Sequence, residues 1–333
     1  MWQSGKKREQ LFREYGVVTF AVLLFVILLL LPTGFEGALS YQNTERVKVQ
    51  VIETDESNVK DTGLVRTGEQ GCTVQILSGI LDHYRLDKEV VLLLLFILLL
   101  VLFAGKMGVK AIFSFVNTIL IVWKVLVPCL LKGWNPIWLS LWIVLSVTVL
   151  LLSLIYGLGH RCLAASLGAT MGIVVTAVLG IIFTDALKIH GATMEASESL
   201  LYAGYQHLDL TGIFMASIFI GAAGAIVDLT VDITSAVYEV VQKKENISAR
   251  EAISTGMAVG RAACGSTVTT LLLAYSGNYI TLLMVFMAQG TPEEFMLNYK
   301  YVAAEIVHTI VGSIGLVTVA PFTAVISGFL FVK

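Results

Sequence analysis

Long apolar stretches, separated by shorter polar segments, dominate the pattern of hydrophobic and polar positions along this 333-residue chain. A helix needs about 20 predominantly apolar residues to cross a bilayer, and eight stretches approach or exceed this length. We expect spanning helices at about residues 16–33, 89–105, 111–131, 136–156, 166–187, 210–241, 263–288 and 301–331. The pattern therefore predicts an all-α polytopic membrane protein with about eight transmembrane helices.

The one long polar segment of the sequence covers residues 35–89, between the first and second predicted helices. Residues 46–51 (RVKVQV) alternate strictly between polar and apolar side chains, a period of two that predicts a half-buried strand. Residues 72–77 (CTVQIL) form a second strand candidate, and the glycines around it predict turns. We therefore expect a small β-rich extracytoplasmic segment, in which no residue pattern suggests catalysis.

Changes in composition divide the chain into four parts. The basic N-terminal segment and first helix occupy residues 1–34, followed by the outer segment at 35–89. Apolar scaffold helices 2–4 lie at 90–156, whereas helices 5–8, rich in Gly, Ala, Ser and Thr, lie at 157–333. Because small residues let membrane helices approach closely, we expect the last four helices to pack on one another and to carry the polar site.

Lys and Arg residues are distributed unequally between the two sides that the predicted helices define. With the N-terminus inside, the inner segments carry twelve of them and the short outer loops carry three, Lys132, Lys188 and Lys300. Cytoplasmic loops of membrane proteins carry such an excess, so we expect a multi-pass protein of the cell membrane with both termini cytoplasmic. The basic start also fits a cleaved signal peptide, but residues 32–38 give no clear cleavage motif and favour a retained anchor.

The overall composition excludes several classes of protein. Hydrophobic residues make up 56% of the chain and charged residues 14%, compared with about 45–50% and about 25% in soluble domains. A net charge of −2 gives no reason to expect a nucleic acid as partner, and four cysteines, one of them in a polar segment, exclude a disulfide scaffold. The chain contains no HExxH, GxSxG, Walker A or GxGxxG motif, so we expect neither an enzyme nor a cofactor.

Ionisable residues recur along one face of the sixth predicted helix. At 100° per residue, steps of 4, 3, 4, 3 and 4 place a single stripe at Gly221, Ala225, Asp228, Asp232, Ser235 and Glu239. Two carboxylates beside small residues cost several kcal/mol if they are dry and unpaired, so they need a cation, a proton, a basic residue or water. The alternative is that the apolar part ends near Val227 and the rest leaves the membrane as an amphipathic helix.

The seventh predicted helix carries polar residues at a matching depth. Reflection of the chain about residues 246 and 247 places Arg261 level with Asp232, where the two can form an ion pair. The following turns carry hydroxyl groups, which suit cation coordination but can also bond back to the preceding turn. These hydroxyls belong to Ser266, Thr267, Thr269 and Thr270.

The eighth predicted helix completes the candidate site. Glu305 and His308 are spaced i, i+3 near its outer end, and Pro321 predicts a kink or break in its middle. Broken helices often flank transport sites, although a packing kink is an equally good interpretation. The candidate transport site therefore comprises Asp228, Asp232, Arg261, Ser266, Thr267, Thr269, Thr270, Glu305 and His308.

Several blocks of the sequence resemble the YibE/F family of bacterial multipass membrane proteins. The most specific blocks lie at 253–275 (ISTGMAVGRAACGSTVTTLLLAY) and 305–324 (EIVHTIVGSIGLVTVAPFTA), preceded by 224–228 (GAIVD). Earlier pieces at 82–85 (DHYR) and 157–168 (GLGHRCLAASLG) fit as well, so the resemblance covers nearly the whole chain.

This resemblance implies an integral membrane protein of the cell envelope without an established biochemical activity, so no catalytic residue is carried over. By position, the recurrent acid of the family corresponds to Asp228, the arginine of its GR pair to Arg261 and the acid of its EIV block to Glu305. His308 stands where the family leads us to expect an arginine, and the outer segment is shorter than expected.

These observations predict a transporter or permease for an unknown small solute or ion, coupled to a cation or a proton. The alternative is a non-transporting structural or accessory membrane subunit whose charges are neutralised internally. The expected partners are the lipid bilayer, an ion or small solute, and either a second copy of the chain or a partner subunit.

Overall fold

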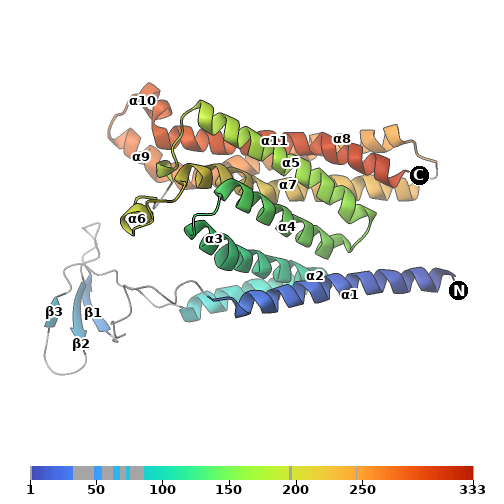
Figure 1. Cartoon of the computed structure of the whole chain (residues 1–333), viewed down its shortest axis with the longest axis horizontal. Coiled ribbons are helices and arrows are strands. Elements are labelled where there is room, and N and C mark those ends of the chain that lie inside the picture. Colours follow the sequence, from blue (N-terminus) through green and yellow to red (C-terminus); the bar gives the residue numbers. More distant parts are fainter. Residues whose placement is uncertain are drawn as a thin grey trace. The chain divides into compact units, whose positions relative to one another are not determined.

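The computed structural model in Figure 1 describes residues 2–32, 49–54, 63–67, 73–75, 86–194, 197–244 and 246–332. These residues belong to two units, which we describe separately. The larger unit is formed by Met1–Thr33 and Val109–Lys333, and the smaller by Gly34–Gly108.

The larger unit consists of helices and their connections throughout its described residues. Its long helices are α1 (Trp2–Leu30), α4 (Pro136–Tyr156), α5 (His160–Ala186), α7 (Leu210–Lys243), α8 (Ala249–Ser276) and α11 (Lys300–Phe331). Shorter elements connect them: a π turn (Val122–Leu126), α3 (Val127–Leu131), 3-10 turns (Gly191–Thr193 and Gly277–Tyr279), α6 (Ser197–Tyr202), α9 (Ile280–Ala288) and α10 (Glu293–Asn298). A further helix, α2 (Leu86–Ile121), has residues in both units.

Local signals in the sequence define where several of these helices begin. The side chain of Asn135 accepts hydrogen bonds from two backbone N–H groups in the first turn of α4, and Pro136 occupies the position where no donor is lost. α8 begins with a capping box in which the side chains of Ser248 and Glu251 each accept a hydrogen bond from the other residue's backbone N–H.

Six of the described helical segments are long and apolar enough to cross a membrane: Lys88–Leu131, Pro136–Tyr156, His160–Ala186, Leu210–Lys243, Ala249–Ser276 and Lys300–Phe331. A shorter apolar helix, Tyr15–Leu30, adds to them. The prediction of a polytopic helical membrane protein is therefore confirmed, but length and composition alone support six spans in the described residues rather than eight.

The 44-residue segment Lys88–Leu131 is more than twice as long as a bilayer requires, and it is not one straight helix. Gly105 has φ 56° and ψ −128°, outside the helical region and at a positive φ that favours glycine. Gly108 lies against the backbone oxygen of Leu100, because a Cβ on Gly108 would be 2.5 Å from it. Residues eight apart in a continuous helix are separated by about 12 Å, so the chain turns back at Gly105, between the second and third predicted helices.

The seventh predicted helix, at 263–288, is placed wrongly, since α8 begins and ends well before these positions. Its first half contains polar residues and many Gly and Ala residues, which lower the hydropathy that we used to find spans. Those small residues pack closely against α11. A Cβ on Gly256 would lie 2.8 Å from the Cβ of Ala324, and one on Gly260 would lie 2.9 Å from the Cβ of Ala320.

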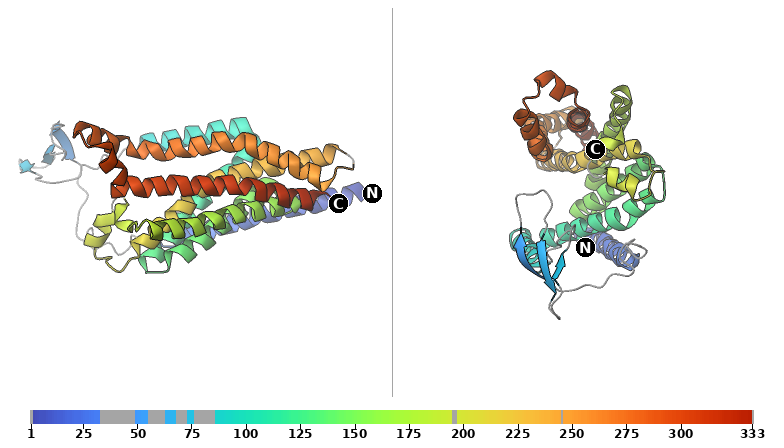
Figure 2. Two further views of the ribbon diagram at one scale, coloured as in Figure 1. Left: turned by 90° about the horizontal axis from the view of Figure 1, so that it is seen from above. Right: turned by 90° about the vertical axis from the view of Figure 1, so that its left-hand side faces the viewer.

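α11 contacts α5, α7 and α8, and these four helices lie side by side (Figure 2). α11 continues through Pro321, so the predicted break is not present. Gly168 of α5 faces Thr323, and a Cβ on Gly172 would lie 2.8 Å from the Cβ of Val319. The GxxxG spacing in α5 therefore brings its backbone close to α11.

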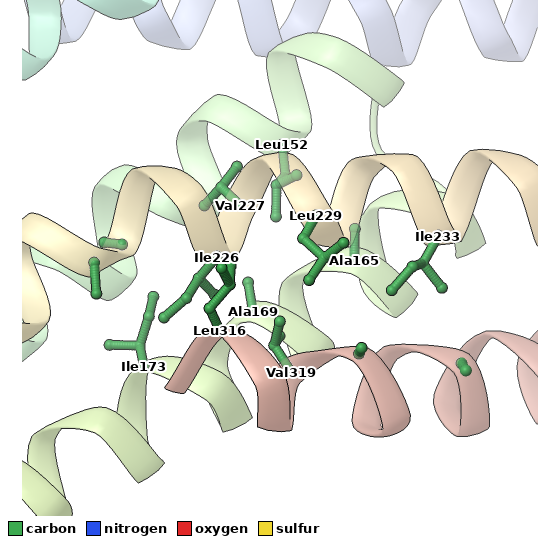
Figure 3. Packing of buried hydrophobic residues seen from close by; sticks show 14 of the residues in the cluster. Leu152, Ala165, Ala169, Ile173, Ile226, Val227, Leu229, Ile233, Leu316 and Val319 are labelled. Carbon is green, nitrogen blue, oxygen red and sulfur yellow. The ribbon is translucent and has the colours of Figure 1, made fainter. Parts of the chain in front are cut away.

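Apolar side chains from α4, α5, α7 and α11 meet in one core between these glycines (Figure 3). The labelled members are Leu152, Ala165, Ala169, Ile173, Ile226, Val227, Leu229, Ile233, Leu316 and Val319. Most of their surface is removed from contact with lipid or water, so packing fixes the relative positions of the helices that carry the polar residues.

The smaller unit contains three short strands, β1 (Val49–Thr54), β2 (Gly63–Thr67) and β3 (Thr73–Gln75). They form an antiparallel sheet in the order β1-β2-β3, in which Val65 pairs with Val51 on one side and Val74 on the other. β1 and β3 overlap the two strand candidates of the sequence. Strands of six, five and three residues do not support a β-rich segment across 35–89, most of which lies outside the described residues.

Lys124, in the π turn, binds the end of α1. Its Nζ donates hydrogen bonds to the backbone oxygens of Leu29, at 3.0 Å, and Leu31, at 2.8 Å. The last carbonyls of a helix have no partner within it, so this lysine satisfies two groups that would otherwise be exposed to lipid. The sequence predicts only that Lys124 extends towards a membrane interface, and the contact with α1 was missed.

Replacing Lys124 with methionine should therefore loosen α1. We expect the free energy of unfolding to fall by about 1–3 kcal/mol, because hydrogen bonds from a charged donor are lost and two carbonyls are left unpaired. The thermal unfolding midpoint in detergent measures this, and Lys132→Met, at an exposed position after α3, serves as the control. Equal midpoints for the two variants would show that the Lys124 contact contributes nothing.

Candidate transport site

One face of α7 is polar and exposed. α7 contacts α4, α5, α8 and α11, and its buried residues include Leu229, Ile233 and Val237. Of the predicted stripe, Gly221, Asp228, Asp232 and Glu239 are exposed, whereas Ala225 and Ser235 are half-buried. We call the exposed residues Gly221, Gly224, Asp228 and Asp232 the α7 polar face. The spacing that places both carboxylates on one face is thus present in the structure.

Both carboxylates lie on a part of α7 that is packed in the bundle. Asp228 is near the middle of the helix, about 22 Å along its axis from Lys243 at 1.5 Å per residue. Buried residues continue as far as Val237, one turn beyond Asp232. The packing of α7 against its neighbours therefore continues beyond Val227.

In the part of the chain that the structure describes, the carboxylates of Asp228 and Asp232 form no ion pair and accept no hydrogen bond. The two carboxylates are one turn apart and repel each other electrostatically. The charge of Asp232 also interacts electrostatically with the hydroxyl of Tyr156 in α4. Insertion scales assign about 2.5–3.5 kcal/mol to an aspartate at the centre of a membrane helix. These acids therefore require a proton, a cation, water or a protein partner.

Arg261 has the predicted depth but not the predicted partner. A Cβ on Gly260 would lie 3.2 Å from Ile233, so the next residue on α8, Arg261, is level with Asp232 on α7. Arg261 is exposed, and among the described residues it forms no ion pair. The predicted ion pair between Arg261 and Asp232 is therefore wrong within one chain. Each of the two residues is the sequence neighbour of the residue that packs between the helices, Gly260 on α8 or Ile233 on α7.

The hydroxyl run of α8 bonds to its own helix. Each hydroxyl donates to the carbonyl oxygen three or four residues earlier, at 2.9–3.0 Å, in Ser266, Thr267, Thr269 and Thr270. Bonding back to the preceding turn is one of the two interpretations that the sequence allows for these hydroxyls. These hydrogen bonds give no indication of a coordinated cation.

Glu305 and His308 lie in a separate group that we call the outer cluster, together with Tyr275 and Tyr279. The hydroxyl of Tyr279 donates to Oε2 of Glu305 at 2.9 Å, and the rings of Tyr275 and His308 have centroids 4.6 Å apart. A Cβ on Gly221 would collide with the hydroxyl of Tyr275 and lie 3.3 Å from Cε1 of His308. Gly221 thus joins the outer cluster to the α7 polar face.

Two buried polar atoms of the outer cluster have no hydrogen-bond partner among the described residues, Oη of Tyr275 and Nε2 of His308. Buried groups of this kind are costly unless they bind a polar partner. Neither tyrosine is among the site residues that the sequence predicts, although their i, i+4 spacing places them one turn apart. Their hydroxyls make this part of the bundle more polar than the count of charged residues indicates.

A second polar group lies at the other end of the α7 polar face. The hydroxyl of Tyr156 donates to the backbone oxygen of Val231 at 2.9 Å and lies 2.8 Å from Oγ of Ser235. The guanidinium of Arg161, at the start of α5, lies 3.1 Å from the ring centroid of Tyr238 in a cation–π contact. Sequence reasoning missed these contacts because Arg161 looked like an ordinary inner-loop cation.

Other features of the described residues do not add a site. No group of three or more His, Cys, Asp or Glu residues is arranged to hold a metal ion in this part of the chain. A small pocket between the α3–α4 and α6–α7 connections is lined by residues that include Trp134, Asn135, His207 and Asp209. None of the predicted site residues lines that pocket.

Comparison with known proteins gives one match. The family model described as YibE/F-like protein matches residues 92–333, which include every residue of the candidate site. No curated protein and no solved structure matches the chain.

Proposed function

The chain belongs to the YibE/F-like family, and we propose that it is a permease that moves a small solute or ion across the cell membrane. Movement of the solute or ion is coupled to a proton or a metal cation held at Asp228. Transport, rather than an enzymatic reaction, accounts for polar side chains at membrane depth in a chain without a catalytic motif.

The observation that supports this proposal is the exposed, unpaired carboxylate of Asp228 near the middle of a spanning helix. Gly224 leaves room beside it, since a Cβ on Gly224 would meet no atom within 4 Å. A carboxylate in this setting is stable only when it holds a proton or meets a cation or water. Alternating between those states is the chemistry of a coupled carrier.

The outer cluster supplies titratable groups between Asp228 and the outer side. His308 and Glu305 can each accept a proton, and their neighbours Tyr275 and Tyr279 carry hydroxyls that can donate and accept hydrogen bonds. Gly221, two turns from Asp228, lies between these groups and the carboxylate. In this proposal, the outer cluster passes protons or polar solutes to the α7 polar face.

A second candidate function is a non-transporting structural or accessory subunit. It is favoured by the exposed polar residues of α8, which suit a protein partner as well as they suit a solute. The two candidates differ in what the isolated protein does. An accessory subunit has no transport activity without its partner, whereas a permease transports alone.

Reconstitution of the purified protein into liposomes tests the proposal. Vesicles with an imposed pH or sodium gradient are supplied with a panel of ions and small solutes, and protein-free vesicles serve as the control. We expect gradient-dependent uptake of at least one member of the panel. Vesicles that take up none of them, and do not dissipate either gradient, would favour the accessory subunit.

We also propose an orientation with eight spans and both termini cytoplasmic. Eight spans result if α1 crosses the membrane and the segment Lys88–Leu131 crosses twice, with its turn at Gly105. The distribution of Lys and Arg favours this orientation.

Cysteine labelling checks this topology. In a background with Cys72 replaced by serine, a cysteine at position 57 (Ser57→Cys) should react with a membrane-impermeant maleimide added to intact cells. A cysteine at position 246 (Asn246→Cys) should react only after the cells are opened. The opposite pattern of labelling would overturn the proposed orientation.

A further inference from the structure

The burial of α8 does not agree with its composition. Among the six candidate spans, α8 is the least apolar. Even so, only 11% of its most apolar 18-residue stretch is buried in the bundle. The corresponding fraction is 44% in α5 and α11, which are more apolar. A helix that exposes this much surface to lipid is expected to be among the most hydrophobic, as the Leu-rich start of α2 is.

The exposed side of α8 is made of small and polar residues at helical spacing. We call it the α8 outward face, and it comprises Ala258, Arg261, Ala262, Gly265, Ser266 and Thr269. It adjoins the α7 polar face, because Gly221 of that face lies against the hydroxyl of Tyr275 of α8. Arg261 and Asp232 are level on these neighbouring antiparallel helices. Lipid tails cannot solvate an arginine and two aspartates, so this combined surface needs a partner.

We propose that the partner is a second copy of this chain, bound through the α7 polar face and the α8 outward face. The charges on this combined surface complement one another, with two carboxylates on α7 and one guanidinium on α8. A two-fold axis along the membrane normal leaves the depth of every residue unchanged, so residues that are level in one copy lie opposite each other between copies. Asp232 of each copy thus meets Arg261 of the other.

This arrangement treats the two carboxylates of α7 differently. On α8 the residue level with Asp228 is Gly265, four residues beyond Arg261, and it has no side chain to pair with an acid. Asp232 is neutralised by Arg261 of the second copy, whereas Asp228 stays available for a proton or cation. Small residues at Gly224, Ala262 and Gly265 allow the two copies to approach closely.

The apolar start of α2 does not match this surface in its chemistry. Residues 90–103 of that helix are Val, Leu, Ile and Phe, and they offer no hydrogen-bonding side chain to an aspartate or an arginine. A second copy, in contrast, presents the opposite charge at the depth where each charge is exposed.

Charge reversal tests the contact in a way that separates pairing between copies from pairing within one. Arg261→Asp alone places acids opposite acids, and Asp232→Arg alone places arginines opposite arginines, so each variant should dimerise at least tenfold more weakly than wild type. When the two variants are co-expressed with different tags, both contacts between copies are restored. We expect them to co-purify and to recover the wild-type dimer fraction in nanodiscs, counted by single-molecule photobleaching.

Pairing within one chain predicts the opposite result, because each variant lacks a complementary partner in its own chain and mixing cannot help. A wild-type protein that is monomeric in nanodiscs, single variants that dimerise normally, or mixed variants that do not recover dimers would each overturn the proposal. A monomer that still transports would leave the proposed permease function intact.

Cross-linking gives a second measurement that does not depend on the charge variants. In a Cys264→Ser background, Gly265→Cys in one copy and Asp228→Cys in the other, co-expressed with different tags, should form a mixed disulfide dimer under mild oxidation in membranes, because these two positions lie opposite each other between copies. Val317→Cys is the matched control, because Val317 is 50% exposed on α11 and lies near the same depth. Equal cross-linking at both positions, or at neither, would contradict an interface at Gly265.

Discussion

Transport activity should be lost when Asp228 is replaced by asparagine, while the folded protein remains. Asparagine keeps the shape of the side chain but cannot hold a coupling cation by charge or release a proton. Asp228 has no partner among the described residues, so the change removes no ion pair or hydrogen bond from the fold. We expect uptake into proteoliposomes to fall at least a hundredfold, about 2.7 kcal/mol in the transport barrier, with a thermal unfolding midpoint near wild type.

Glu239→Gln is the matched control for this variant. Glu239 lies on the same stripe of α7, but it is near the C-terminal end of the helix, where it forms an exposed ion pair with Lys243 at 3.9 Å. Such a pair contributes little, so this variant should transport normally. Full activity of Asp228→Asn, or its failure to fold while Glu239→Gln folds, would make Asp228 a structural residue.

The second large effect is expected at Gly172, in the centre of the bundle. A Cβ on Gly172 would lie 2.8 Å from Val319 and 3.2 Å from Ile226, so valine cannot fit unless α5 and α11 separate. Overpacking of this kind costs about 1–3 kcal/mol, and more where three helices must move. Gly172→Val should therefore lower the thermal unfolding midpoint and the yield of monodisperse protein in detergent.

Gly16→Val provides the comparison for Gly172→Val. Gly16 is also within a helix, but a Cβ there meets no atom within 4 Å, so valine can be accommodated. The two variants make the same chemical change in a packed and in an open position. Similar midpoints for both would show that close approach of α5 to α11 is not important for stability.

Periodicity predicted those parts of the fold that depend on one helix at a time. The spacing from Gly221 to Glu239 placed Asp228 and Asp232 on a single face, which the structure reproduces. The GxxxG at Gly168 and Gly172 marked the close contact with α11. Both predictions depend only on the spacing of residues within one helix, so they can be made from the sequence.

Contacts between helices were harder to predict. Reflection about the α7–α8 connection gave the correct depth for Arg261, but depth does not determine direction around the helix axis. Arg261 is exposed because Gly260, its neighbour, occupies the position facing α7 and α11. The ion pair was therefore expected in the wrong place, and its absence within one chain led to the proposed contact between copies.

Hydropathy was misleading where helices pack through small residues. The first half of α8 is rich in glycine and alanine and was not recognised as part of a spanning segment, although Gly256 and Gly260 contact α11. Aromatic hydroxyls were also overlooked, since Tyr275 and Tyr279 count as apolar residues in such a pattern. Their contacts with His308 and Glu305 became visible only in three dimensions.

Infrared difference spectroscopy of the reconstituted protein tests directly the claim that Asp228 exchanges a proton or a cation. Raising the pH, or adding the coupling cation, should remove the band of a protonated carboxyl group. The band should be absent in Asp228→Asn and present in Asp232→Asn. A difference spectrum that Asp228→Asn leaves unchanged would contradict the claim, because the titrating carboxyl would then lie elsewhere.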